Sequence, residues 1–396
     1  MPPAYLDRRR SATQVERTLK MVFSSTTRNF ILPMNHRLLL ALLVSSLFLP
    51  AQARTEFGKL NGAEYRIDVP STWNHGLVVY CHGYDPHPGG VGYDERKPLP
   101  PELAVFVKAG YAVIQSGYSA GGWAVEQAIG DIEGLRKYFV EKYGAPKETY
   151  ITGHSLGGLL TVVMIEKYPE IYNAGLAMCG AVGNASDLLT RGFDARVVFD
   201  YYFPGVLPNP AKVPKDFELT EQLSKSVFQR IEAKPQAAAA MRKFAGIHDN
   251  RDLTGTIVLV THILKDVEQR AGGNPFDNRN TIYTGTSDDN ALNDRVQRYL
   301  ADKGALAYLQ RHDTLTGHLT RPVLSIHTTY DPLVPATIPN EYSLLTREAG
   351  AGDLFVQQYV KHDGHCHITA EETEKGFQQL RRWKDSHQAP KPGWLH

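Results

Sequence analysis

The sequence predicts an α/β fold, a mostly parallel sheet flanked by helices and interrupted by a helical insertion. Short apolar strands alternate with helical segments up to about residue 183, and again from about residue 319. Strands that are apolar on both faces are typical of parallel sheets, because helices cover both faces. The stretch 184–318 has a helical character, and a connection of that length without structure of its own is uncommon. We therefore expect this stretch to form a cap.

Strands and helices alternate regularly in the first half of the chain. Strands are predicted at AEYRIDVP (63–70), GLVVYCHG (76–83), YAVIQSG (111–117), ETYITG (148–153) and NAGLAMCG (173–180). Helices are predicted at LAVFVKAG (103–110), where Gly110 marks the end, and at LLTVVMIEKYP (159–169). One more helix is indicated by apolar residues at three- and four-residue spacing: Val125, Ala128, Ile129, Ile132, Leu135 and Phe139.

The insertion and the second half follow the same rules. Within the insertion, one helix is predicted with Leu219, Leu223, Val227 and Ile231 on one face, and an alanine-rich helix covers Ala237–Ala240. The alternation of strands and helices then returns. A strand is predicted in PVLSIHTTYDPLVP (322–335), a helix around IPNEYSLLTREAG (338–350), a strand at LFVQQYV (354–360) and a closing helix at EETEKGFQQLRRWKD (371–385).

The N-terminal region has the pattern of a secretory signal peptide. Residues 34–37 form a basic start, residues 38–49 are apolar, and a small-residue Ala-Gln-Ala cleavage site follows. The apolar run is short for a membrane span, although a buried helix or an anchor is the alternative interpretation. We expect the mature chain to begin near Arg54 and to be exported, either secreted or periplasmic.

The predicted organisation follows from these patterns. It comprises a disordered leader or mis-assigned start at 1–33, a signal peptide at 34–53, the first part of the core at 54–183, a helical cap at 184–318 and the second part of the core at 319–396.

Composition excludes some classes of partner. The chain has 43 Lys and Arg residues against 42 Asp and Glu residues, so it carries no overall basic signature of nucleic-acid binding and no sign of an acidic partner. We expect a small-molecule or short oligomeric substrate, no nucleic acid, and no membrane span after removal of the signal peptide.

Two segments match G-x-S-x-G, a turn that presents a nucleophilic serine: GYSAGG at 117–122 and GHSLGG at 153–158. Local chemistry does not choose between Ser119 and Ser155, but their order in the chain favours Ser155. Such sites need a backbone donor from the loop after an earlier strand, here at His82-Gly83-Tyr84. One strand–helix unit, 111–143, separates this loop from Ser155. We expect the donor strand and the Ser155 strand to be neighbours, with the intervening strand on the far side.

With these motifs in order, the chain resembles the α/β-hydrolase family. The resemblance covers roughly 60–183 and 319–385 and rests on CHGY, GHSLGG, HTTYDPLVP and GHCHIT. Within the family, the chain looks most like secreted bacterial hydrolases described as esterases or serine peptidases with a helical cap. It differs from tannase-like and feruloyl-esterase-like enzymes, in which a cysteine commonly neighbours the nucleophile, because His154 and Leu156 flank Ser155 here.

The resemblance implies the remaining site residues. It places the acid at Asp331, after the strand VLSIH, with Asp353 and Asp363 as alternatives, and the base at His365, which follows Gly364 and matches the GHC pattern. His362 and His367 are the alternative bases. A metal site formed by these three histidines is disfavoured, because a flexible loop is poor at fixing coordination geometry. We expect no metal and no cofactor.

The oxyanion donors and the substrate contacts complete the prediction. The family pattern assigns the oxyanion donors to the backbone N–H groups of Leu156 and Tyr84. Substrate contacts are expected from aromatic residues: Trp123 in the Ser119 loop, and Tyr201, Tyr202 and Tyr283 in the cap. Cys81, Cys179 and Cys366 fall near the carboxyl ends of strands, and Cys179 and Cys366 are either a disulfide or buried free thiols.

These residues favour an exported serine hydrolase that cleaves a carboxylic ester through an acyl-enzyme on Ser155. A serine peptidase of the aminopeptidase or prolyl-peptidase type would use the same triad. A non-catalytic binding protein on a hydrolase scaffold is the third alternative.

Overall fold

The computed structural model describes residues 53–87, 97–183, 185–313 and 315–396. The predicted leader lies outside these ranges, as does the predicted signal peptide apart from Ala53. Within the described ranges, no helix is both long and apolar enough to cross a membrane.

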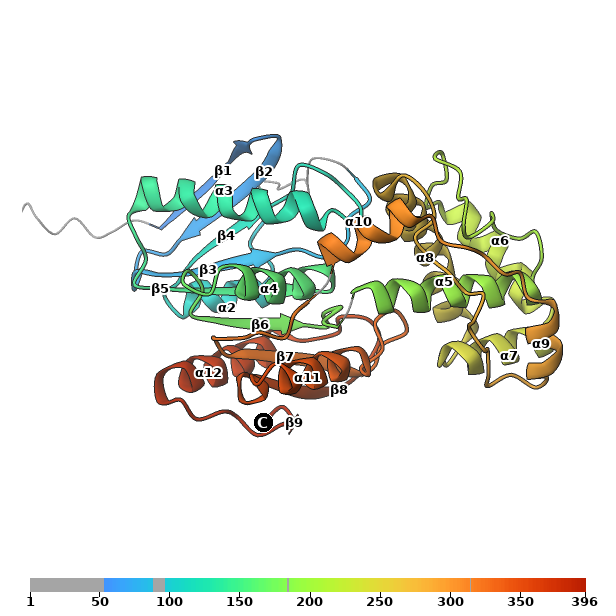
Figure 1. Ribbon diagram of the computed structural model, residues 1–396. Helices are drawn as coiled ribbons and strands as arrows, with labels where there is room; N and C mark the ends of the chain where they lie inside the picture. Colours follow the sequence, from blue (N-terminus) through green and yellow to red (C-terminus); the bar gives the residue numbers. More distant parts are fainter. Residues whose placement is uncertain (1–52, 88–96, 184, 314) are drawn as a thin grey trace, which may run out of the picture. The chain divides into compact units, whose positions relative to one another are not determined.

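A nine-stranded sheet runs through the described residues (Figure 1). Its strands are β1 (Arg54–Leu60), β2 (Ala63–Val69), β3 (Gly76–Cys81), β4 (Ala112–Ser116), β5 (Glu148–His154), β6 (Ala174–Met178), β7 (Val323–Tyr330), β8 (Phe355–Asp363) and β9 (Gly393–Trp394). Their spatial order is β1-β2-β4-β3-β5-β6-β7-β8-β9. The neighbouring strands from β4 to β9 pair in parallel, whereas β1 with β2 and β2 with β4 are antiparallel.

Two apolar clusters cover the sheet, because the central strands are buried on both faces. In β3, Leu77 and Val79 belong to one cluster and Val78 belongs to the other, as the two-residue period of a strand requires. Helices α3 (Val125–Tyr143), α4 (Leu156–Lys167) and α11 (Ile338–Glu348) contribute to the first cluster, and helices α2 (Pro101–Lys108) and α12 (Ala370–Ser386) contribute to the second.

The order of the central strands confirms the expectation about the donor loop. Strand β3, which ends at the His82-Gly83-Tyr84 loop, pairs directly with β5, and β4 lies on the far side of β3. The carboxyl ends of β3 and β5 are therefore adjacent, which brings the donor loop beside Ser155.

Strand β1 has no counterpart in the sequence prediction. It forms a hairpin with β2 in which Leu60 pairs with Ala63, and the two turn residues Asn61 and Gly62 both have positive φ. An Asn-Gly pair is a strong hairpin signal, and it was available in the sequence. The short strand β9, which pairs with β8, was also not predicted.

Between β6 and β7 the chain forms helices α5 (Ala185–Tyr202), α6 (Glu221–Glu232), α7 (Pro235–Ala245), α8 (Asn250–Ala271), α9 (Asp289–Arg295) and α10 (Lys303–Asp313). The predicted apolar face of α6 is wrong at Leu219, which precedes the helix and is exposed. The reason is that Thr220 is the N-cap residue of α6. Its side chain accepts a hydrogen bond from the Leu223 N–H, so the helix begins after Leu219. Val227 and Ile231 are buried.

Candidate active site

Ser155 lies at a sharp turn between β5 and α4. Its backbone has φ 56° and ψ −119°, a conformation that non-glycine residues rarely adopt and that occurs mainly where the surrounding structure enforces it. The Ser155 N–H donates to the Met178 carbonyl, and the Ser155 carbonyl accepts from the N–H groups of Gly158 and Leu159 at the start of α4. The turn is thus held from both sides with the hydroxyl group at its tip.

The glycines of this turn are required by close backbone contacts. A Cβ atom on Gly153 or on Gly157 would collide with the Cys81 carbonyl oxygen at the end of β3. A Cβ atom on Gly158 would meet the backbone of Gly180 after β6. The G-x-S-x-G-G pattern therefore reflects the tight packing of this turn and the start of α4 against the ends of β3 and β6, the two strands that flank β5.

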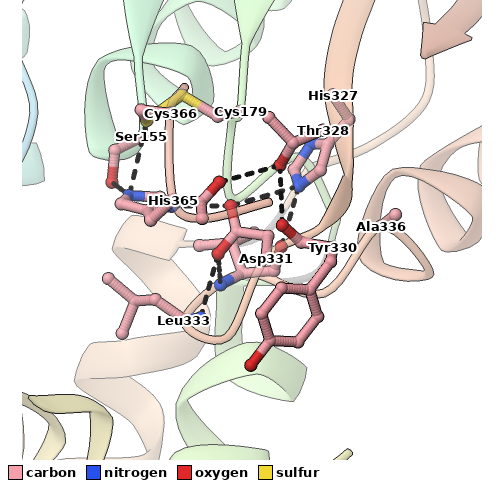
Figure 2. A network of polar contacts seen from close by, with 12 residues as sticks. Ser155, Cys179, His327, Thr328, Tyr330, Asp331, Leu333, Ala336, His365 and Cys366 are labelled. Carbon is pink, nitrogen blue, oxygen red and sulfur yellow. Dashed lines mark hydrogen bonds and ion pairs between the residues drawn. A yellow bond between two sulfur atoms is a disulfide. The ribbon is translucent and has the colours of Figure 1, made fainter. Parts of the chain in front are cut away.

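Ser155, His365 and Asp331 form a hydrogen-bonded chain (Figure 2). His365 Nδ1 lies 2.7 Å from Asp331 Oδ2, and His365 Nε2 lies 2.8 Å from Ser155 Oγ. A carboxylate only accepts hydrogen bonds, so Nδ1 carries the proton and Nε2 of the neutral ring accepts the serine proton. This tautomer is the one a general base needs.

The carboxylate of Asp331 is buried and held in place. Its Oδ1 accepts hydrogen bonds of 2.9 Å from the N–H groups of Leu333 and Val334. Burial alone would raise the pKa of Asp331, but the nearby His327 ring and the hydrogen bonds from His365 and the Val334 N–H outweigh it and hold the pKa well below its usual range. Asp331 therefore stays charged and orients His365.

The other candidate bases and acids have different partners. His362 Nε2 lies 3.0 Å from Glu372 Oε1, and His367 Nδ1 donates to the Asp363 carbonyl at 2.5 Å. Asp353 lies in a short 3₁₀ helix, Gly352–Leu354, that precedes β8. The structure brings only Asp331 and His365, out of these candidates, into the chain that ends at Ser155.

Ser119 is held by a different contact. Its hydroxyl group donates to Asp131 Oδ2 at 2.8 Å, and its backbone N–H donates to the same oxygen at 2.7 Å. The Ser119 hydroxyl group therefore donates its proton to a carboxylate on α3, and this contact holds the loop in place.

The topology and the serine turn together decide the fold. The chain has an α/β-hydrolase fold. Its mostly parallel sheet places a serine turn after β5, an acid after β7 and a histidine after β8, in the chain order of this fold.

No family model matches this chain. Acetylxylan esterase A of Aspergillus ficuum is 32% identical over 176 residues, which are 37% of this chain and 55% of the relative. Probable acetylxylan esterase A of Aspergillus niger is 31% identical over the same coverage. The chain thus spans about half the length of the curated relatives it matches.

Solved structures similar to the chain have low sequence identity. They include the Pyrococcus furiosus esterase Pf2001 (15% identity, TM-score 0.46, covering 84% of this chain and 91% of that chain). A puromycin-hydrolyzing peptidase of Mycobacterium tuberculosis has 13% identity and a TM-score of 0.47, and the match covers 88% of this chain and 42% of that chain.

A disulfide joins the histidine loop to the sheet. It links Cys366, next to His365, to Cys179 at the end of β6 (Figure 2). Strand β6 pairs with β5, the strand that leads to Ser155. The bond therefore ties the segment that carries the base to the neighbourhood of the serine. Cys81 is a buried free thiol.

His154, the residue before Ser155, differs from His365. Burial, together with the nearby His365, lowers the pKa of His154 to about 4, and its Nδ1 lies 3.3 Å from the hydroxyl group of Tyr80. His154 therefore stays neutral at ordinary pH.

Tyr84, in the donor loop, contacts helix α8. Its hydroxyl oxygen lies 2.7 Å from His262 Nδ1, and His262 Nε2 lies 3.0 Å from Lys265 Nζ. An ammonium group has only donors, so Nε2 accepts and Nδ1 of the neutral ring carries the proton. His262 thus donates to the Tyr84 oxygen, which leaves the Tyr84 proton for another acceptor. Sequence reasoning did not foresee this contact.

Helix α8 also holds the loop that carries Trp123. Asp266 Oδ2 accepts the Trp123 N–H at 2.5 Å and pairs with Arg270 Nε at 2.9 Å. Arg270 donates in turn to Gln127 Oε1 and to the Gly121 carbonyl. A Cβ atom on Gly122 would collide with the Asp266 carboxylate, so glycine is needed at this contact.

A cavity of about 510 Å³ opens beside Ser155, lined by residues of both the core and the insertion. Tyr84, Trp123, Leu156 and Tyr283 of the predicted site residues line it. Tyr201 and Tyr202 are not part of the lining, in contrast to the expectation. The part of α5 that lines the cavity ends at Ala195, and both tyrosines lie farther along the helix, where they contact each other.

Proposed function

We propose that the chain is a serine hydrolase that cleaves a carboxylic ester through an acyl-enzyme on Ser155. The observation that carries the proposal is the hydrogen-bonded chain from Asp331 through His365 to Ser155, whose last member lines the cavity. The similarity to relatives named acetylxylan esterase A supports an ester as substrate.

The first half of the reaction follows from these contacts. Ser155 Oγ attacks the ester carbonyl carbon while its proton passes to His365 Nε2, and Asp331 stabilises the imidazolium ion that forms. The C–O bond to the alcohol then breaks, His365 returns the proton to the alcohol oxygen, and an acyl-enzyme remains. In the second half, a water molecule gives a proton to His365 and attacks the acyl carbon. The bond from the acyl carbon to Ser155 Oγ then breaks, His365 returns the proton to Oγ, and the acid leaves.

The developing oxyanion needs donors close to Ser155. We assign the backbone N–H groups of Leu156 and Tyr84 to this role. Gly83 supports the assignment, because a Cβ atom placed there would lie 3.3 Å from the Ser155 Cβ atom, so the donor loop passes directly beside the nucleophile. Loss of one such donor costs about 3–4 kcal/mol of transition-state stabilisation in other hydrolases.

The insertion then acts as a cap. Helices α5, α7 and α8 contribute to the wall of the cavity beside Ser155, and α8 contacts both Tyr84 and the Trp123 loop. A cap in this place excludes water from the acyl-enzyme and shapes the substrate pocket.

Export is part of the proposal. The signal-peptide pattern predicts cleavage before Arg54, where β1 begins, so processing leaves the first strand intact. The Cys179–Cys366 disulfide is of the kind that persists in an oxidising compartment.

A serine exchange tests the proposal. Ser155→Ala is expected to lower kcat on p-nitrophenyl esters by at least about 10⁴-fold and to abolish labelling by a fluorophosphonate probe. Ser119→Ala is the matched control and keeps most activity, because Ser119 is bonded to Asp131. Labelling of Ser155→Ala at the wild-type rate would refute the assignment. Cleavage of aminoacyl-nitroanilides but not of esters would assign the triad to a peptidase.

A further inference from the structure

The cavity beside Ser155 has a mostly apolar inner wall. Leu188 and Ala195 come from α5, Phe244 from α7, Leu259 and Val260 from α8, and Leu333 from the loop after β7. These side chains belong to separate elements of the insertion and the core, so apolar side chains line the cavity from several elements. Such a wall favours an apolar ligand group, since apolar surface gains free energy when it leaves water.

The lining also contains Tyr283 and charged residues, which are either bonded within the protein or exposed to solvent. The Tyr283 hydroxyl group donates to Asp194 Oδ1 at 2.7 Å and accepts from the Asn278 amide at 2.9 Å. Burial raises the pKa of Asp194, against the hydrogen bond from Tyr283 and the charge of Arg298. The other charged residues of the lining, Asp187 and Arg191, are exposed and therefore lie at the solvent side.

The solvent side of the cavity also carries an apolar side chain. Ile282, next to the buried Tyr283, lines the cavity and is 72% exposed. At this place it extends the apolar surface that a ligand in the cavity would contact.

The size of the cavity also favours a ligand group larger than acetyl. At about 510 Å³ it lies within the range of roughly 300–1,000 Å³ that takes a drug-sized ligand. An acetyl group has only two carbon atoms and would leave most of the wall without a contact.

We infer that the substrate is an ester with a medium-length alkyl or aryl group, which occupies this cavity while the ester carbonyl meets Ser155. This inference rests on the proposed function and narrows its substrate class. Each methylene group that leaves water for an apolar wall favours binding by roughly fourfold. Allowing for incomplete contact, kcat/KM is expected to rise at least tenfold when about four methylene groups are added to the side of the ester that enters the cavity.

Two ester series test the inference and identify the side of the ester that enters the cavity. In one, p-nitrophenyl esters vary from acetate to decanoate. In the other, acetate esters of alcohols vary from methanol to octanol. A rise with length in either series supports the inference, and the series that shows it identifies the acyl or the alcohol side. Fastest turnover of the shortest member in both series would overturn it.

Filling the cavity supplies the second measurement. In the series that shows the rise, Ala195→Trp on α5 and Leu259→Trp on α8 are expected to lower kcat/KM at least tenfold for the longest ester and less than threefold for the shortest. Ala239→Trp, at an exposed position of α7 in the same insertion, is the matched control and leaves both rates unchanged. Equal effects of Ala195→Trp and Ala239→Trp on the length preference would contradict the inference.

A binding measurement separates this inference from the proposed function. In the Ser155→Ala protein, 2-decanone is expected to raise Tm, acetone is not, and Ala195→Trp should remove the effect. If no ester is hydrolysed but the Tm shift persists, the esterase proposal fails and the apolar site stands. If esters are hydrolysed without a length preference and 2-decanone has no effect, the apolar site fails and the esterase proposal stands.

Discussion

At the scale of single residues, Asp331 combines burial with several donors. His365 Nδ1 and the N–H groups of Leu333 and Val334 all point at its two oxygens (Figure 2). His327 Nε2 is 3.6 Å from Oδ2 and donates to the Val334 carbonyl at 2.7 Å. The low pKa of Asp331 means that its ionisation does not limit activity on the acid side of neutrality.

Asp331→Asn is therefore expected to reduce kcat by about 10⁴-fold, because the amide no longer stabilises the imidazolium ion or selects its tautomer. The free energy of unfolding should change far less than activity. Steady-state kinetics and urea unfolding measure the two effects. Asp363→Asn is the control, and a larger loss of activity in that protein would move the acid to the other position.

At the scale of elements, the Cys179–Cys366 disulfide joins two segments that are 187 residues apart in the chain. It fixes the loop after β8 at the residue next to His365, so we expect it to affect activity as well as stability. The double substitution Cys179→Ser, Cys366→Ser should lower kcat about tenfold and destabilise the fold by about 2–5 kcal/mol.

Activity and unfolding of the double variant are measured at a temperature where it remains folded. Wild-type protein treated with a reductant should show the same lowered kcat. An unchanged kcat in both samples would mean that packing alone positions His365.

A second feature at the scale of elements is the buried carboxyl group of Glu268 in helix α8. Its Oε2 accepts the Val213 N–H at 2.9 Å, while Oε1 has no hydrogen-bond partner among the described residues. Burial raises the pKa of Glu268 from 4.5 to about 8. The unfolded chain thus loses this proton at lower pH than the folded chain does, so folding stability falls as pH rises from about 4.5 to about 8.

Glu268→Gln removes this ionisation. The variant should gain stability relative to wild type between pH 5 and pH 8.5, by an amount on the order of a few kcal/mol. Urea unfolding at both pH values measures the difference, and Glu218→Gln, at an exposed position, should show none. A constant difference between Glu268→Gln and wild type across this range would show that the group ionises normally in the folded protein.

At the scale of the whole molecule, the first strand pairs with β2 and is also joined to helix α3 through one carboxylate. Glu56 in β1 accepts hydrogen bonds from Tyr65, Tyr138, Lys142 and Tyr143. Burial opposes its ionisation, but these donors outweigh it and lower the pKa of Glu56 to about 2. Strand β1 is therefore an integral part of the fold.

Mass spectrometry of exported protein is expected to show an N-terminus near Arg54, at the start of β1. A start beyond Glu56 would remove the carboxylate that joins β1 to α3, so we expect no such species in folded material. Exported protein that still begins at Met1 would refute the signal-peptide interpretation.

Local patterns were sufficient for much of the fold. Alternating apolar strands and helices identify the central sheet, and GHSLGG identifies a serine turn, because these signals depend on near neighbours in the chain. The two strands that were missed, β1 and β9, lie at the sheet edges, where apolar patterning is weak.

The tertiary structure decided what depends on distant residues. The sequence favoured His365 as the base but left His362 and His367 as alternatives, and the loop geometry brings His365 to Ser155. Tyr201 and Tyr202 were expected at the cavity because they are aromatic, but helix packing decides which end of α5 lines it.

The sequence by itself determined the order of the strands along the chain, the serine turn and the approximate positions of acid and base, since each is a local pattern. Only the tertiary structure decided which side chains meet. His262 reaches Tyr84 across 178 positions and Asp266 reaches Trp123 across 143, and a single sequence carries no signal for such pairs. Their contacts arise from the packing of α8 against the core, which local patterns do not encode.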